Sequence, residues 1–110
     1  MSYKIGALIP STSNGMNWKS AKDSHLYKLF IKSFLLTYNN NYSYVIYVVI
    51  DKNDPIYDKE ESKEYFKRLI NIMRNVDIKF IYSNGINKGH VTEMWNIAFT
   101  QAYNENCDYF

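Results

Sequence analysis

The chain contains few of the residues that cross-link, kink or loosen a fold. Among its 110 residues are one cysteine, two prolines and four glycines. The single cysteine, Cys107, excludes an intramolecular disulfide and a cysteine-rich zinc site, and we expect it to be a small buried residue near a helix end. No linker-like or repetitive stretch divides the sequence, and its length suits one domain covering residues 1–110.

Long apolar runs and an excess of one charge are also missing. The longest apolar run has only the length of a strand, so we expect no membrane-spanning helix. Residues 5–9, which precede Pro10, are too few for the apolar core of a secretory signal, so the sequence predicts a cytoplasmic protein. The net charge is +2, with both signs interspersed, and nucleic acid is therefore not expected as a partner.

The standard signatures of nucleotide and zinc sites are absent as well. The sequence has neither a G-x-G-x-x-G loop nor a G-x-x-x-x-G-K-[ST] loop, which excludes Rossmann dehydrogenases and P-loop nucleoside triphosphatases. Its two histidines, His25 and His90, lie far apart and lack the spacing or the cysteine partners of a zinc site. We therefore predict no metal site within this chain.

The sequence does contain three apolar segments of strand length. They are residues 3–10 (YKIGALIP), 44–50 (YVIYVVI) and 78–83 (IKFIYS). The middle segment is a run of seven β-branched or aromatic residues. Apolarity that is continuous rather than alternating predicts burial on both faces, which is typical of a parallel sheet.

Two helical patterns lie between these strands. Residues 27–38 carry apolar side chains at the spacing of one helix face, with Ser20 or Asp23 as the expected cap. A second helix is expected from Asp58 onward, because Asp58 and Glu61 have the spacing of a capping box. Its apolar stripe consists of Tyr65, Leu69, Ile72 and Val76.

A third helix and the start of a fourth strand complete the pattern. The helix is expected after Gly89 and up to about Asn106, and residues 108–110 then begin a strand. The order β-α-β-α-β-α-β predicts right-handed crossovers and an α/β fold with a Rossmann-like parallel sheet. Helices should cover both faces of this sheet, which gives a three-layer α-β-α arrangement.

Three polar loops follow the strands and should meet at the carboxyl edge of the sheet, where α/β proteins bind ligands. Asp51 could accept hydrogen bonds from a ribose or a base, and Asp54 follows it; both could equally be turn formers or helix caps. Lys88 and Gly89 could place a cation and backbone N–H groups near a phosphate, or form only a helix junction with a solvated lysine. Three aromatic residues near these loops could stack on a base or sugar: Trp18, Tyr57 and Tyr82.

Several segments resemble the amino-terminal half of family-2-like glycosyltransferases with the GT-A fold. Residues 5–12 (IGALIPST) resemble the first strand of that family, and residues 47–54 (YVVIDKND) are similar to the second, which usually ends in Asp-Asp-Gly-Ser. Residues 87–89 (NKG), 96–98 (NIA) and 107–110 (CDYF) resemble the region around the third helix. The resemblance extends from Tyr3 to Phe110.

This resemblance implies an α/β half-domain that binds a nucleotide sugar, expected to be a UDP sugar, for transfer to an acceptor. The family's nucleotide-contacting positions correspond here to Pro10, Ser11, Thr12, Asp51, Lys88, Gly89 and Asn96, together with Asp54. Residues 52–54 (KND) depart from the family's Asp-Gly-Ser, so Asp54 could take over part of the role of that loop.

The family binds its metal through an Asp-x-Asp motif just after the fourth strand, and the sequence stops before that motif. The resemblance therefore implies Mn²⁺ or Mg²⁺ for a full-length enzyme, but neither a cofactor nor a catalytic residue within this chain, which is expected to be inactive alone. Without a complete fourth strand, residues 3–10 would form an exposed edge that promotes self-association. The alternative is a small, complete α/β module that binds a ligand or partner without catalysis.

Overall fold

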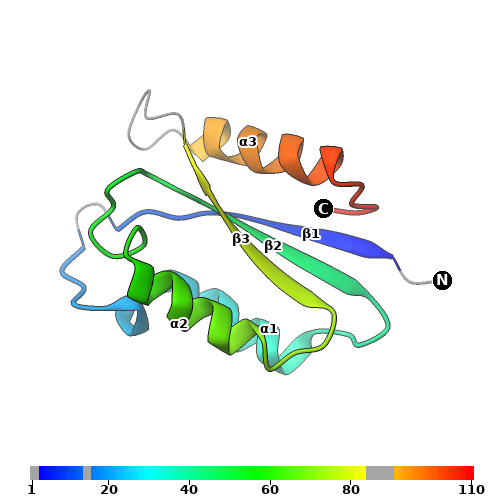
Figure 1. Cartoon of the computed structure of the whole chain (residues 1–110), viewed down its shortest axis with the longest axis horizontal. Helices are drawn as coiled ribbons and strands as arrows, with labels where there is room; N and C mark the ends of the chain where they lie inside the picture. Colours follow the sequence, from blue (N-terminus) through cyan, green and yellow to red (C-terminus); the bar gives the residue numbers. More distant parts are fainter. Residues whose placement is uncertain (1–2, 14–15, 84–90) are drawn as a thin grey trace.

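A computed structural model describes residues 3–13, 16–83 and 91–110 (Figure 1). Strands and helices alternate along the chain, as the sequence predicts. In order they are β1 (Lys4–Pro10), the 3-10 helix η1 (Ala21–Asp23), the π-helix η2 (Leu26–Ile31), α1 (Lys32–Thr37), β2 (Ser43–Ile50), α2 (Glu60–Ile70), β3 (Val76–Tyr82) and α3 (Val91–Asn104). Within the described ranges, no helix has the length and apolarity needed to cross a bilayer.

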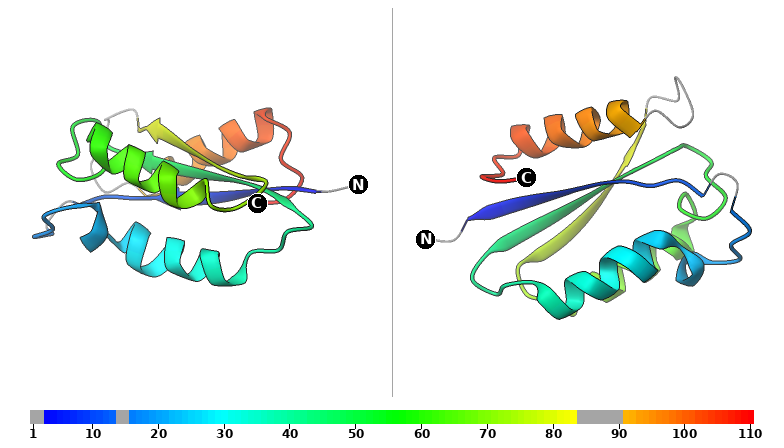
Figure 2. Two further views of the ribbon diagram at one scale, coloured as in Figure 1. Left: turned by 60° about the horizontal axis from the view of Figure 1, so that its bottom comes forward. Right: turned by 180° about the vertical axis from the view of Figure 1, so that it is seen from behind.

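The three strands form one parallel sheet in the order β1-β2-β3. Gly6 of β1 lies opposite Val45 of β2, and Val48 of β2 lies opposite Phe80 of β3. α1 and α2 cover one face of the sheet and α3 covers the other, which the views in Figures 1 and 2 show from different sides. The chain is therefore a small α/β domain whose parallel sheet is compatible with a Rossmann-like fold.

The central strand β2 is buried on both faces, which confirms the prediction from its unbroken apolar sequence. From Val45 to Ile50, no residue is more than 7% exposed. Alternate residues enter two separate cores because successive side chains of a strand point to opposite faces. One core joins Ile46, Val48 and Ile50 to Leu26, Phe66 and their neighbours, and the other joins Val45, Tyr47 and Val49 to Met94, Ala98 and Ala102.

The end of the chain pairs with β1 and begins a fourth strand position. Tyr109 forms an isolated parallel bridge with Ile5, the Gly6 N–H donates to the Tyr109 carbonyl at 2.8 Å, and the Asp108 N–H donates to the Lys4 carbonyl at 2.7 Å. This confirms the predicted start of a strand. Beyond Gly6, the outer edge of β1 has no strand partner among the described residues, and self-association through that edge stays a prediction.

The first helical segment differs from its prediction in its cap and its winding. Neither Ser20 nor Asp23 caps it; instead the Ser24 hydroxyl oxygen accepts a 3.2 Å hydrogen bond from the Tyr27 N–H. Asp23 accepts the Lys19 N–H, four residues earlier. The segment that follows is π-helical in η2 and becomes α-helical only in α1. Apolar residues spaced by three and four positions predict an α-helix, so the sequence did not predict the π-helical turns.

The second helix is shorter than its apolar stripe. It ends at Ile70, so the prediction that Ile72 and Val76 belong to it is wrong: Ile72 is 75% exposed and Val76 begins β3. Asn75 has a left-handed backbone, with φ of 59°, and its carbonyl accepts the Tyr44 N–H at 2.8 Å. Pairing with β2 therefore turns the chain into the sheet before the helical pattern is complete.

The predicted capping box of this helix is also wrong. The cap position is Lys59, whose side chain makes no capping hydrogen bond. Asp58 instead directs its carboxylate toward the loop after β2 and the end of β3, where the backbone N–H of Asn53 and the side chains of Lys63 and Tyr82 donate to it. Tertiary partners thus outcompete the local cap.

Gly6 of β1 lies against the carboxyl-terminal part of α3. A Cβ at this position would stand 3.3 Å from both the Ala102 Cβ and the Sγ of Cys107, which is buried as predicted. We expect Gly6→Ala to lower the free energy of unfolding by about 1 kcal/mol, because the packed interface must shift to admit a methyl group. Urea denaturation measures this loss. It should shrink in a Cys107→Ala background, and an equal loss in both backgrounds would contradict the assigned clash.

Candidate functional site

Polar loops meet at the carboxyl edge of the sheet, as the sequence predicts. The Ser11 N–H donates to the Val49 carbonyl at 2.9 Å, and the Ser83 N–H donates to the Ile50 carbonyl at 2.8 Å. These bonds continue the sheet by one residue past β1 and β3. They hold Ser11 and Ser83 beside the carboxyl end of β2, at one end of the molecule (Figure 1).

Asp54 is the most fully bonded side chain at this edge. Its Oδ2 accepts the Ser13 N–H at 3.0 Å. Its Oδ1 accepts the Ser13 hydroxyl at 2.6 Å and the backbone N–H groups of Ile56 and Tyr57, each at 2.9 Å. The residue is only 6% exposed. Asp54 therefore ties the loop after β1 to the loop after β2, and its carboxylate faces donors inside the protein.

These donors keep Asp54 ionised in spite of its burial. Burial raises the pKa of Asp54, but the Ser13 hydroxyl and the backbone N–H groups of Tyr57, Ser13 and Ile56 lower this pKa by more, so the net shift is downward. The sequence allowed Asp54 either a ligand role or a structural role. The geometry gives it the structural one, and contact with a ligand stays a prediction.

Asp51 differs from Asp54 although both lie in the same loop. Asp51 is half-buried, and its Oδ1 accepts the Ser83 hydroxyl at 2.8 Å. Among the residues that the structure describes, no second donor reaches this carboxylate. Asp51 thus has one oxygen held in place and another available to an incoming hydroxyl or N–H group, which is the arrangement expected of a ligand-contacting carboxylate.

A cavity of ≈ 300 Å³ opens beside the end of β1. Pro10, Ser11 and Thr12 form one wall, and aromatic and aliphatic side chains from the region of η2, among them His25 and Phe30, form the other. Ligand cavities are commonly apolar with a few polar groups, and they start at about this volume. The sequence predicted the first wall but not the second, because the residues of η2 resemble ordinary core positions.

The three aromatic residues proposed for stacking take different positions. Tyr57 borders this cavity but is 1% exposed, and its ring packs edge-on against Trp18 with centroids 6.1 Å apart. Trp18 also packs against His25, with centroids 4.9 Å apart. Tyr82 lies at the end of β3, where its hydroxyl donates to Asp58 at 2.6 Å. Stacking on a ligand stays a prediction for all three.

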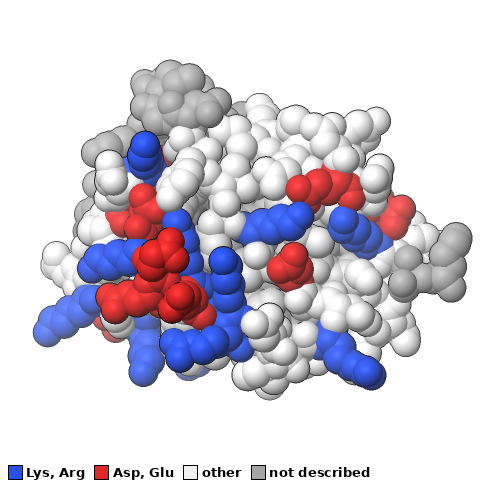
Figure 3. Space-filling model, in the orientation of Figure 1, with Lys and Arg blue, Asp and Glu red and all other residues white. Residues whose placement is uncertain are grey.

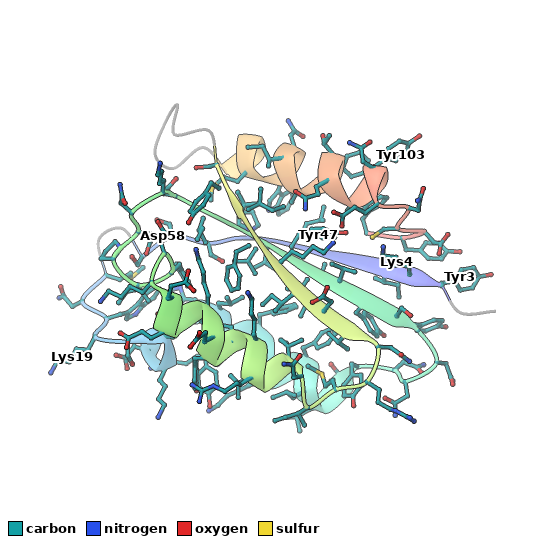
Figure 4. All side chains as sticks on the ribbon, in the orientation of Figure 1. Tyr3, Lys4, Lys19, Tyr47, Asp58 and Tyr103 are labelled. Carbon is teal, nitrogen blue, oxygen red and sulfur yellow. The ribbon has the colours of Figure 1, made fainter. Side chains whose placement is uncertain are left out.

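The sequence did not predict the ionic cluster around Tyr82. Lys63 Nζ lies 3.0 Å from both Asp58 Oδ1 and the Tyr82 hydroxyl (Figure 4 labels Asp58). Burial raises the pKa of Asp58, but Tyr82, the Asn53 N–H and Lys63 lower it by more, and Tyr82 and Asp58 raise the pKa of Lys63. The cluster fastens α2 to the end of β3. The sequence gives no signal for this cluster, because its three members are common surface residues and Tyr82 lies far from the other two along the chain.

The remaining predicted site residues do not join the cavity. Asn96 is exposed on α3 and lines a shallow hollow with Gln101 and Glu105, apart from Thr12 and its neighbours. Lys88 and Gly89 lie outside the described residues.

Nowhere in the described ranges do three or more His, Cys, Asp or Glu side chains form a group that could hold a metal ion.

Comparison with known proteins returns no match. No protein-family model, no curated protein and no solved structure matches this chain. A functional proposal must therefore rest on the residues at the sheet edge, on the cavity and on the strand order.

Proposed function

We propose that this chain is the nucleotide-binding portion of a GT-A glycosyltransferase, which takes a sugar from a nucleotide donor, most simply a UDP sugar, and transfers it to an acceptor. The observation that carries the proposal is the ≈ 300 Å³ cavity beside Pro10, Ser11 and Thr12. The resemblance of residues 5–12 to the first strand of that family gives this loop the same role.

Strand order supports a ligand site at this position. In open α/β sheets, ligands bind at the carboxyl ends of the strands where the strand order reverses. β2 and β3 lie on one side of β1, whereas Tyr109 bridges to its other side after α3 has crossed the opposite face of the sheet. The order therefore reverses at β1, whose carboxyl end borders the cavity.

The proposal divides the edge residues into two roles. Thr12 and Ser11 face the ligand from the cavity wall, and Asp51 accepts a hydrogen bond from a ribose hydroxyl or a base N–H group through its available oxygen. Asp54 keeps both loops in place through Ser13, and contact of its carboxylate with the nucleotide stays a prediction. A cytoplasmic location, expected from the sequence, belongs to this proposal.

The resemblance implies that Mn²⁺ or Mg²⁺ binds the diphosphate of the donor. In that family, residues just after a complete fourth strand hold the metal ion. No described group of acidic or histidine side chains fits such an ion. A bound divalent cation would neutralise the diphosphate charge in the full-length enzyme. This chain's own residues would bind and orient only the nucleoside, so we propose that it has no transferase activity by itself.

Titration of the chain with uridine, followed by NMR, tests the proposal. We expect weak binding, with a Kd on the order of 1 mM, because a nucleoside without its diphosphate makes few contacts. Resonances of Thr12 and Asp51 should shift, and Mn²⁺ should not change the affinity. Asp51→Ala should weaken binding by about tenfold, equal to ~1.4 kcal/mol, because it removes one charge-assisted hydrogen bond.

A matched control is Asp77→Ala on β3. Asp77 is exposed and pairs in register with Val45, far from the carboxyl edge, so its loss should leave uridine binding unchanged. Thermal unfolding should be similar in both variants. A large loss of stability in Asp51→Ala would identify Asp51 as a structural turn residue, and an absence of shifts around Thr12 would contradict the proposed site.

A non-catalytic partner-binding module is the second candidate, and one surface feature favours it. Trp95, Phe99 and Tyr103 follow each other at four-residue spacing along α3 and are all exposed, and Phe110 packs on Phe99 with centroids 4.6 Å apart. The DNA that follows the codon for Phe110 distinguishes the candidates. A further strand and an Asp-x-Asp motif favour the transferase, whereas a stop codon favours the module.

A further inference from the structure

A second cavity lies between the segment around η1 and the beginning of α2. Its volume is ≈ 230 Å³, and it shares no lining residue with the cavity beside Thr12. Lys19 and Lys22 enter it from one side, while Lys59, Ser62 and Arg68 enter it from α2 and the residue before that helix. Figure 4 labels Lys19, which lies at the same end of the molecule as the start of α2.

The lining of this cavity is strongly cationic. Four of its side chains are basic, namely those of Lys19, Lys22, Lys59 and Arg68, and one, that of Glu61, is acidic. None of the four basic groups lies within 4 Å of a carboxylate in the described ranges, where the ion pairs are Lys63 with Asp58 and Lys79 with Glu105. Figure 3 shows charged side chains gathered over α2, in contrast to the largely uncharged surface over α3. The positive charge in the cavity is therefore only partly compensated.

Ser62 adds an unpaired hydroxyl group to the wall of this cavity. It is 4% exposed and lines the cavity. Its hydroxyl makes no hydrogen bond with any residue that the structure describes. No fully buried side-chain nitrogen or oxygen of the described residues lacks a hydrogen-bond partner, so the Ser62 hydroxyl reaches the solvent that fills the cavity. A ligand oxygen in the cavity can replace that water as the hydrogen-bond partner of Ser62.

The start of α2 adds backbone donors to the same place. Lys59 occupies the cap position, where an oxygen-bearing side chain is usual, and no side chain caps the helix. The N–H groups of the first turn are therefore left for another acceptor, and the helix dipole favours an anion. Glu60 and Glu61 in this turn oppose a bound anion, and Glu61 lines the cavity.

We propose that this cavity binds a phosphate group carried by a small molecule. Lysine ammonium and arginine guanidinium groups, a free hydroxyl and helix N–H groups are all donors, and phosphate oxygens accept from each of them. The volume is several times the ~30 Å³ share of one water molecule, so a phosphate and part of its carrier fit together. This site is independent of the proposed nucleoside site, since no residue belongs to both.

Isothermal titration with pyrophosphate at fixed ionic strength tests this site. We expect a Kd on the order of 1 mM or tighter and weaker binding of inorganic phosphate, because two linked phosphates meet more of the cations. Lys22→Gln and Arg68→Gln should each weaken binding by about fivefold. Glu61→Gln should strengthen binding by about threefold, because it removes the one carboxylate in the lining.

Lys67→Gln is the matched control. Lys67 is exposed on α2 and does not line the cavity, so its loss should not change the affinity. Ser62→Ala, which removes only a hydroxyl, covers the case in which a charge variant fails to fold and should weaken binding by about threefold. No binding of pyrophosphate, or equal losses in Lys67→Gln and Arg68→Gln, would overturn the proposal. Uridine lacks phosphate and pyrophosphate lacks a nucleoside, so this site and the proposed function fail separately.

Discussion

Replacement of Asp54 by alanine is expected to lower the free energy of unfolding by about 3 kcal/mol. The carboxylate accepts from the N–H and the hydroxyl of Ser13 and from the N–H groups of Ile56 and Tyr57. Alanine leaves these buried donors without an acceptor and disconnects the loops after β1 and β2. Urea denaturation followed by circular dichroism measures the loss.

Asp54→Asn keeps the shape of the side chain but removes its charge and one acceptor oxygen. It therefore distinguishes the effect of the carboxylate from the effect of losing the whole side chain. Its single carbonyl oxygen can still accept from Ile56 and Tyr57, but its amide group would face the Ser13 N–H as a second donor. We therefore expect Asp54→Asn to cost about half as much as Asp54→Ala. Equal stability of Asp54→Ala and the wild type would show that water replaces the carboxylate and that the loops do not depend on it.

The same variant has a pH signature. The folded pKa of Asp54 lies below its unfolded value, so the stabilisation is present above about pH 4, the unfolded value, and is lost as the pH falls through the folded pKa. The stability difference between wild type and Asp54→Asn should accordingly shrink below pH 4. Uridine binding should weaken in Asp54→Ala as well, because Ser13 no longer holds the loop that follows Thr12.

The sheet was predictable because its determinants are local runs of apolar residues. The seven apolar residues of β2 require burial on both faces wherever they lie, and a parallel sheet between helices satisfies this requirement. The start of a strand at Tyr109 was predictable from the alternation of strands and helices. The end of α2 was not predictable, because Val76 suits a helix face and a strand equally well. Its pairing with Tyr44 places it in β3.

The candidate site was predictable in outline but not in its division of roles. Strand ends place Asp51 and Asp54 at the same edge, and residue type alone makes them equivalent. Only the three-dimensional arrangement shows that Ser13, 41 residues away, donates twice to the Asp54 carboxylate, whereas Asp51 keeps one oxygen available. The aromatic wall of the cavity and the free hydroxyl of Ser62 depend likewise on contacts between distant segments, which no local pattern encodes.

Glu105 is expected to show the second largest effect, because it connects α3 to two strands. Its Oε1 accepts the Tyr47 hydroxyl at 2.7 Å and the Lys79 ammonium at 2.8 Å, and its Oε2 accepts the Gln101 amide at 3.2 Å. Figure 4 shows Tyr47, which is fully buried, between the sheet and α3. Burial first, and then Glu105 and Cys107, raise the pKa of Tyr47, so its hydroxyl remains a donor at any ordinary pH.

We expect Glu105→Ala to lower the free energy of unfolding by about 2 kcal/mol. Most of this loss comes from the buried Tyr47 hydroxyl, which is left with only the weak Cys107 thiol as a partner at 3.6 Å. The Lys79 contact adds less, because solvent screens its partly exposed ammonium group. In a double-mutant cycle with Tyr47→Phe, the two losses should therefore be far from additive.

Acid should remove the contribution of Glu105. Lys79 and then Tyr47 lower the pKa of Glu105 from 4.5 to about 2. Its stabilisation is therefore complete above the unfolded pKa and disappears as the pH falls from about 4.5 toward 2. Thermal melts of the wild type and Glu105→Gln should differ at pH 7 and converge near pH 2. If the difference between them is the same at both pH values, the carboxylate charge does not hold α3 on the sheet, and shape complementarity between Tyr47 and α3 must do so instead.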